Sequence, residues 1–367
     1  MRKLVKHNMV VGCFWLCIVG FMLVFLVGEK QERSLAERRK LKELPTLTLE
    51  GIQDKSYMEA IEEYLLDHFP ARDWFRSVKA HFSYDVLRQK ENNDIYVADG
   101  YAGKLEYPLH ETSVYRAAKK IQSLQAQYFP EQEVYYAIIP DKNYFLAQKN
   151  GYPSMDYDRL REIMQEELSE MTYIDIWDTL SIEDYYSTDT HWRQERLQDT
   201  SLCIGEHMGF GQCLTSEYEI QEISDFYGVY YGQSALPLSA EQLYFLTNDT
   251  IKTATQWSLE TDKTLPVYIK EEEAGVDKYN IFLSGAQALQ VIKSPLAKTQ
   301  KRLIVFRDSF ASSIVPLWLE AYEEIVLIDI RYIHSDLLDE YVDFDKKDTQ
   351  ILFLYNTLLL NNSSMLK

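Results

Sequence analysis

The chain has 367 residues, of which 46% are hydrophobic, and its formal net charge is −19. Beyond Val27 it carries 35 basic against 57 acidic residues, a net charge of −22. This excess of negative charge excludes nucleic acid or an anionic polymer as a long-range electrostatic target. It leaves open a neutral or acidic polysaccharide that binds in a local pocket.

Residues 1–28 predict a cytoplasmic tip and a membrane anchor. Arg2, Lys3 and Lys6 precede an uncharged apolar stretch from Met9 to Val27. As a helix with a rise of about 1.5 Å per residue, this stretch approaches the ~30 Å thickness of a bilayer core. No cleavage pattern of small residues follows it. The leading basic residues favour a single-pass protein of the cell membrane with its C-terminal domain outside, and a buried core helix is the alternative.

Residues 29–55 predict a charged linker, in which Gln31–Leu44 is expected to form a helical stalk. Residues 56–367 are expected to form the extracytoplasmic domain. At its start, Ser56–Gln89 has helical periodicity in its apolar positions. Residues 94–105 predict a hairpin, because Asp99-Gly100 suits a two-residue turn.

The next part of the chain alternates between helical and strand patterns. We expect helices over 111–127, 157–171 and 194–207, and strands over 134–139 and 173–176. From about 211 to 300, short runs rich in tyrosine, threonine and glycine predict a β-rich insertion. Buried strands then resume over 303–306, 325–328 and 351–355. Such alternation is typical of an α/β fold with a parallel sheet flanked by helices.

Three residues in two motifs suggest acyl-transfer chemistry. Asp189 stands two positions before His191, and in an extended segment these side chains point to the same side, as a carboxylate that orients an imidazole requires. Ser309 follows the apolar run Leu303–Phe306, where nucleophilic hydrolases place their serine. The alternative is structural, because Asp189 could form a surface ion pair or cap the helix that follows.

The cysteines and histidines indicate no metal site. Cys13 and Cys17 lie in the predicted membrane segment, and Cys203 and Cys213 are the pair beyond it. That second pair could form a disulfide that closes a short loop, or remain as free thiols. No Cys/His spacing in the chain resembles that of a zinc site.

The order of motifs resembles that of the DHHW family of Gram-positive bacteria and, more distantly, that of alginate O-acetyltransferase-like members of the SGNH-hydrolase superfamily. The matching segments are Asp67–Trp74, Ile95–Tyr101, Ile139–Lys142, Asp189–Trp192, Arg307–Phe310 and Asp329–Tyr332. Thr190 departs from the family name, which calls for histidine there, so position 190 is not expected to be chemically essential. The resemblance implies an SGNH-hydrolase-like fold.

The resemblance also implies roles for single residues. Ser309 would be the nucleophile, His191 its base and Asp189 the carboxylate that fixes the imidazole tautomer. Arg331 would bind an acyl or sugar oxygen, although it could instead pair with Asp329 or Asp336. Tyr355 is a further candidate for the substrate pocket. The backbone N–H of Ser309 would form part of an oxyanion hole whose second donor the sequence does not reveal.

The function implied by the resemblance is a membrane-anchored extracytoplasmic O-acyltransferase that transfers acetyl groups, or an acetylesterase, that acts on cell-envelope polysaccharide. Such systems imply a membrane-bound O-acyltransferase partner that moves acetyl groups across the bilayer, and they need no metal or organic cofactor. A catalytically silent envelope protein that binds glycan or scaffolds a polysaccharide assembly complex is the alternative. Removal of the β-rich insertion is expected to change acceptor preference more than ester hydrolysis.

Overall fold

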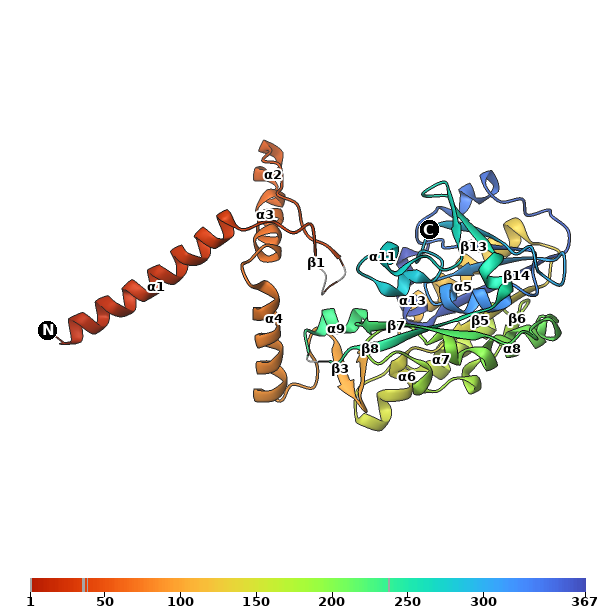
Figure 1. The fold of residues 1–367 in the computed structure, drawn as a ribbon, viewed down its shortest axis with the longest axis horizontal. Coiled ribbons are helices and arrows are strands. Elements are labelled where there is room, and N and C mark those ends of the chain that lie inside the picture. The colour runs from red at the N-terminus through yellow and green to blue at the C-terminus, as the bar shows by residue number, and fades with distance from the viewer. Residues whose placement is uncertain (1, 35–36, 38, 237) are drawn as a thin grey trace. The chain divides into compact units, whose positions relative to one another are not determined.

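The structure, a computed structural model, describes residues 2–34, 37, 39–236 and 238–367 (Figure 1). The chain divides into two units. One comprises residues 1–93 and 231–237, and the other comprises residues 94–230 and 238–367. The division after residue 93 differs from the boundary expected at residue 56, because the helices that follow residue 56 group with the N-terminal segment.

The first unit contains the N-terminal helix and a group of shorter helices. Residues Lys6–Val27 of the N-terminal helix are long and apolar enough to cross a membrane, as the sequence predicts. The elements of this unit are α1 (Arg2–Val27), β1 (Arg33–Ser34), β2 (Arg39–Lys40), α2 (Leu49–Gln53), α3 (Ser56–Asp67), α4 (Arg72–His81) and the π-helix η1 (Phe82–Val86).

The helical stalk expected over Gln31–Leu44 is wrong for the described part of that segment, and residues 35, 36 and 38 lie outside the described residues. β1 and β2 pair there as a short antiparallel ladder. The segment is extended because of a buried carboxylate, Asp67. This group accepts hydrogen bonds from the Arg39 guanidinium at 2.8 Å and from the Lys42 amide at 2.9 Å. An extended chain lets both donors reach the end of α3.

The second unit is built on an eight-stranded sheet whose order is β10-β9-β11-β13-β12-β14-β5-β6. The five strands from β13 to β6 are parallel, and β11, β9 and β10 extend the sheet in antiparallel fashion. The strands are β5 (Val134–Ile139), β6 (Thr172–Ile174), β9 (Thr255–Ser258), β10 (Lys263–Pro266), β11 (Leu289–Lys293), β12 (Arg302–Arg307), β13 (Glu324–Ile328) and β14 (Thr349–Asn356).

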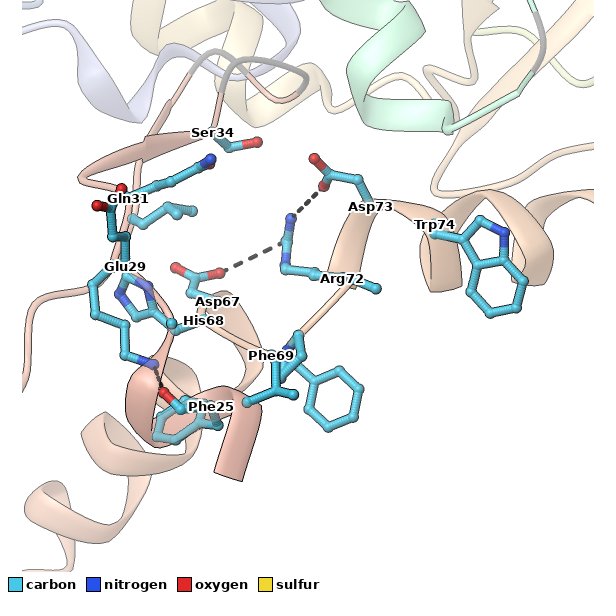
Figure 2. A pocket seen from close by; sticks show the side chains of 16 residues that line it. Phe25, Glu29, Gln31, Ser34, Asp67, His68, Phe69, Arg72, Asp73 and Trp74 are labelled. Carbon is cyan, nitrogen blue, oxygen red and sulfur yellow. Dashed lines mark hydrogen bonds and ion pairs between the residues drawn. The ribbon is translucent and has the colours of Figure 1, made fainter. Parts of the chain in front are cut away.

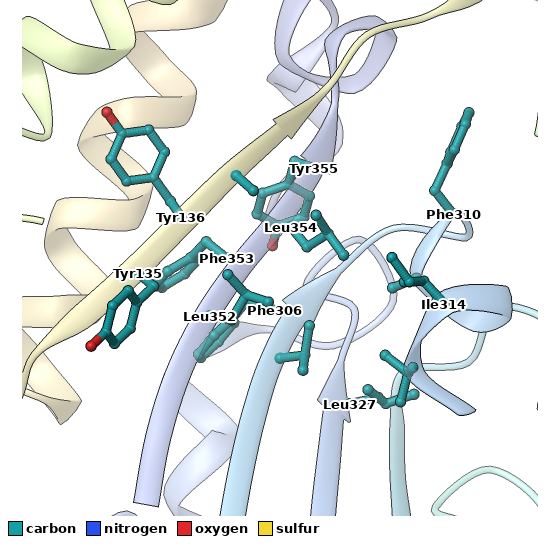
Figure 3. Packing of buried hydrophobic residues seen from close by; sticks show 14 of the residues in the cluster. Tyr135, Tyr136, Phe306, Phe310, Ile314, Leu327, Leu352, Phe353, Leu354 and Tyr355 are labelled. Atoms are coloured by element: carbon teal, nitrogen blue, oxygen red, sulfur yellow. The ribbon is translucent and has the colours of Figure 1, made fainter. Parts of the chain in front are cut away.

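The last strand in sequence lies inside the sheet. β14 pairs with both β12 and β5 (Figure 3). Ile351 is opposite Ile304 on one side and Val134 on the other. Every residue of β5 and of β12 is buried, which explains the continuous apolar run Leu303–Phe306 in β12 and the apolar and aromatic sequence of β5. The rings of Phe306 and Phe353 stack across this pairing with centroids 4.5 Å apart.

Helices cover the parallel part of the sheet much as their periodicity predicts. In α5, for example, Val114, Ala117 and Ile121 recur at helical spacing and are all buried. The α-helices of this unit are α5 (Glu111–Tyr128), α6 (Lys142–Leu146), α7 (Tyr157–Glu167), α8 (Gln198–His207), α10 (Asp249–Thr253), α11 (Glu271–Ala274), α12 (Ala311–Ile314) and α13 (Thr357–Asn361). Helix α9 (Val229–Ser234) begins in this unit and ends in the other.

Short 3-10 helices complete the connections. They are η2 (Gln148–Asn150), η3 (Trp177–Thr179), η4 (Ile182–Asp184), η5 (Gln194–Arg196), η6 (Gly211–Cys213), η7 (Lys278–Ile281), η8 (Val315–Trp318), η9 (Ser335–Glu340) and η10 (Ser363–Met365). The predicted hairpin is formed by β3 (Ile95–Ala98) and β4 (Tyr101–Lys104) around Asp99-Gly100.

The segment from about 211 to 300 is rich in strands, as expected, but only part of it stands apart from the central sheet. β7 (Glu219–Phe226) and β8 (Glu241–Thr247) form a separate antiparallel pair. β9, β10 and β11 instead widen the central sheet beside β13. Cys203 and Cys213 are both free thiols in the structure.

Candidate active site

Ser309 lies in the tight turn that joins β12 to α12. Asp308, just before it, is buried and shapes this turn with both carboxylate oxygens. One oxygen accepts the Phe310 amide at 3.0 Å, and the other accepts the Asn356 amide at 2.7 Å from the end of β14. Burial raises the pKa of Asp308. The turn is therefore fixed to the neighbouring strand, and the Ser309 side chain is left partly exposed.

Asp189 and His191 lie in a loop closed by an antiparallel bridge between Tyr185 and Trp192. Within this loop the Asp189 carboxylate is 1% exposed, and its Oδ2 lies 2.6 Å from His191 Nδ1. The loop also approaches the serine turn, because the Trp192 indole N–H donates to the Phe310 carbonyl at 2.9 Å. Trp192 is fully buried, so it packs in the core and does not line a substrate site.

The structure brings the three predicted residues into one hydrogen-bonded line. His191 Nε2 lies 2.8 Å from Ser309 Oγ, on the side of the ring opposite the nitrogen that faces Asp189. A carboxylate at Nδ1 holds the proton on that nitrogen, which leaves the Nε2 lone pair to accept from the serine hydroxyl. This arrangement can remove the Ser309 proton as the hydroxyl attacks an electrophile.

The His191 imidazole is held between two aromatic rings. The ring of Tyr279, in η7, stacks on it with centroids 3.9 Å apart and an interplanar angle of 8°. Phe310 packs against it at 4.9 Å. The Tyr279 hydroxyl donates to Ser313 Oγ at 2.9 Å, which anchors the stacking ring to the helix after the nucleophile turn.

The β7–β8 region fixes the backbone of the Asp189 loop. Glu241, in β8, accepts the amides of Ser187 and Thr188 at 2.8 and 2.7 Å. The Val229 amide donates to Asp189 Oδ1 at 2.6 Å. Gly228 passes so close that a Cβ atom there would lie 2.2 Å from the carbonyl carbon of Thr188. Only glycine therefore fits at this contact.

Lys142 is a buried cation behind the same loop. Its ammonium group donates to the carbonyls of Tyr186 at 2.9 Å and Ser187 at 3.3 Å. Burial lowers the pKa of Lys142 to about 7, against the opposing attraction of Asp189, Glu241 and Asp141. The loop is thus held by a cation on one side and by the Glu241 carboxylate on the other.

A pocket of about 410 Å³ opens beside Ser309. Arg331 lines it and at the same time forms a bidentate pair with Asp329, at 2.8 and 2.5 Å, which is the structural alternative expected for this arginine. Its contact with an acyl or sugar oxygen stays a prediction. The lining residues are Lys104, Thr190, Asp308, Ser309, Phe310, Arg331, Asn356, Leu358, Leu359, Asn362 and Met365.

Tyr355 is not among the residues that line this pocket. It lies in the core at 2% exposure, and its ring packs near that of Phe353 (Figure 3). Within the described residues its hydroxyl has no hydrogen-bond partner. In this structure Tyr355 is therefore buried away from the pocket beside Ser309. Its contact with a substrate stays a prediction.

No family model matches the sequence, and no curated protein matches it. Among solved structures, a DHHW family protein from Eubacterium siraeum has 19% identity, covers 75% of this chain and 95% of its own, and has a TM-score of 0.60. The chain shares the fold of a DHHW family protein. Bacillus cereus PatB1 has the same fold, with 19% identity over 74% of this chain and 98% of its own and a TM-score of 0.56. PatB1 with a sulfonyl adduct is similar at 18% identity, over 74% and 96% of the two chains, with a TM-score of 0.55.

Within this DHHW-type fold, the residues that support the Asp189 loop are not predictable from local sequence patterns. Tyr279, Glu241 and Gly228 carry no motif of their own, and each acts on a segment 40 to 90 residues away. Gly228 offered a usable signal, since it stands among aromatic residues in Phe226-Tyr227-Gly228-Val229-Tyr230. Across the described residues, no group of three or more His, Cys, Asp or Glu side chains could hold a metal ion.

Proposed function

We propose that this protein is a membrane-anchored O-acyltransferase or acylesterase that acts outside the cell on envelope polysaccharide, with acetyl as the acyl group. The observation that carries the proposal is the hydrogen-bonded line of Asp189, His191 and Ser309 beside an open pocket. The shared fold with a DHHW family protein and the apolar helix α1 support it further.

In the first half-reaction, Ser309 Oγ attacks the carbonyl carbon of an acyl ester, and its proton passes to His191 Nε2. The carbonyl oxygen becomes an oxyanion. The Ser309 N–H is one donor to it, and the Thr190 hydroxyl is the second, since its oxygen already accepts from Tyr230 and its own proton remains available. This role revises the expectation that position 190 has no chemical part. Collapse breaks the ester C–O bond, and the leaving alcohol takes the proton from His191.

In the second half-reaction, a hydroxyl group attacks the acyl-enzyme. His191 Nε2 removes the proton of that hydroxyl, and the tetrahedral intermediate expels Ser309 Oγ, which regains a proton. A sugar hydroxyl in the pocket completes transfer, whereas water completes hydrolysis. Lys104 and Arg331 supply hydrogen-bond donors on the pocket wall for the sugar or acyl oxygens.

The deciding experiment measures p-nitrophenyl acetate hydrolysis by the full chain in detergent, beside Ser309→Ala and His191→Ala. We expect kcat/KM to fall at least about 1,000-fold in each variant. Ser216→Ala, which changes an exposed serine outside the pocket, is the matched control and should retain the parent activity.

A covalent probe tests the same serine without turnover. Because PatB1 was solved with a sulfonyl adduct, a sulfonyl fluoride is the reagent of choice. We expect one label per chain, on Ser309, and no label in Ser309→Ala. If the parent and the variants all hydrolyse the ester only at the background rate, and Ser309 is not labelled, the proposed enzymatic activity is wrong. The protein would then be better explained as a glycan-binding scaffold.

A further inference from the structure

The helices next to the membrane anchor carry a large apolar face that the structure leaves uncovered. On α4 and η1, Trp74 is 62%, Val78 43%, Phe82 54% and Val86 63% exposed. These residues recur every four positions and fall on one side of a helix, together with Phe75. A soluble surface rarely keeps so many large apolar side chains in one contiguous stripe.

The opposite side of α4 is polar and already engaged. Arg72 and Arg76 both pair with Glu37, at 2.6 and 3.2 Å. Arg72 also lies 3.7 Å from Asp67 (Figure 2). These ion pairs fix the rotation of α4 about its axis. Figure 2 shows the Trp74 ring directed away from Asp67 and Arg72. The apolar stripe therefore points outward as a consequence of the ion pairs.

Aromatic contacts connect this stripe with the predicted membrane helix. Phe21 of α1 stacks on Phe69 at 5.4 Å and packs against Phe75 at 5.9 Å, and Phe25 packs against Tyr64 at 6.1 Å. Phe21 stands six residues before Val27, which is about 9 Å along a helix. A helix that lies in the membrane interface buries its apolar face by about 5–10 Å.

We propose that α4 and η1 lie on the outer surface of the lipid bilayer, with the side chains of Trp74, Phe75, Val78, Phe82 and Val86 inserted among the lipids. Tryptophan and phenylalanine on one face with Arg72 and Arg76 on the other is the composition of an interfacial helix. The arrangement depends on α1 spanning the bilayer and is independent of the acyl-transfer chemistry.

The test measures tryptophan quenching by brominated lipids with the full chain reconstituted in phosphatidylcholine–phosphatidylglycerol vesicles. Trp15, in the middle of α1, reports on the membrane span, and the difference between the parent and Trp15→Phe isolates its signal. The difference between Trp15→Phe and Trp15→Phe/Trp74→Phe isolates Trp74. Bromine near the methyl end of the acyl chain should quench Trp15 most strongly.

For Trp74 we expect the reverse depth dependence. Bromine near the headgroup should quench its signal roughly twofold more than bromine near the methyl end, and aqueous iodide should quench it little. Quenching by iodide but not by bromolipid would overturn the proposal, because the stripe would then face water. If neither iodide nor bromolipid quenches Trp74, the proposal is also wrong, because another protein surface would then cover the stripe. If bromolipid does not quench Trp15, α1 does not span the bilayer and the proposal fails.

Discussion

Tyr279 sets the plane of the His191 ring, and its effect on catalysis can be separated from its effect on folding. Aromatic pairs of this kind are worth about 0.5–1.5 kcal/mol beyond the area they bury. Asp189 holds one ring nitrogen, and the 3.9 Å stack on Tyr279 together with Phe310 further opposes rotation about the Cβ–Cγ bond. Loss of the stack should therefore loosen the approach of Nε2 to Ser309.

We expect Tyr279→Leu to lower kcat for p-nitrophenyl acetate by about 3- to 10-fold with little change in KM. Tyr279→Phe keeps the ring and loses only the hydrogen bond to Ser313. This variant should therefore have the kcat of the parent but a lower melting temperature. Steady-state kinetics with a melting curve for each variant checks this. Equal loss of kcat in both variants would assign the effect to the hydroxyl instead.

At the scale of elements, the β7–β8 region supports the Asp189 loop rather than only shaping an acceptor site. The amides at 228 and 229 and the Glu241 carboxylate all bind residues 187–189. Removal of this region should therefore abolish ester hydrolysis and transfer together. The structure thus revises the expectation that its loss changes acceptor preference more than hydrolysis.

The substitution Gly228→Ala tests whether the position of the Asp189 loop matters for catalysis. In Gly228→Ala the added carbon would lie 2.2 Å from the backbone of Thr188, so the loop must move and Asp189 with it. Because displacement of a catalytic group by about 1 Å can cost about 100-fold, we expect a loss of that size in kcat/KM. Val229→Ala keeps the amide that binds Asp189 and is the control. Parent-like activity in Gly228→Ala would show that the loop position is unimportant.

Periodicity predicts the helices and buried strands well, because α5 and β12 satisfy local patterns that the sheet then reinforces. The same periodicity marked apolar positions in α4 and η1, but it could not show that Trp74 and Phe82 stay exposed, since coverage depends on what packs against a helix. Nor could it show that β9 to β11 join the central sheet, because strand partners are chosen by contacts distant in sequence.

At the scale of the whole molecule, Lys142 links stability to pH. Its folded pKa is about 7, whereas an unfolded lysine titrates near 10.5. Between these values the unfolded chain holds one more proton, so this group makes stability rise with pH, by up to about 1.4 kcal/mol per pH unit. Below pH 7 both states are protonated, and the cost of burying the ammonium is present in full.

Lys142→Met should remove that contribution. We expect the melting temperature of the parent, relative to that of the variant, to rise between about pH 7 and pH 10. Lys149→Met alters an exposed lysine of the same unit and should follow the parent. Melting curves of the three proteins across this range make the comparison. Parallel profiles for the parent and Lys142→Met would mean that Lys142 keeps its proton throughout.

The central place of β14 has a consequence for synthesis. A ribosome releases the chain from its N-terminus, so β5 and β12 emerge long before the strand that separates them in the finished sheet. Until residues 349–356 arrive, Asp308 lacks the Asn356 amide, and two strand edges stay open. A product that stops short of residue 349 is thus a target for proteases and aggregation rather than a smaller working protein.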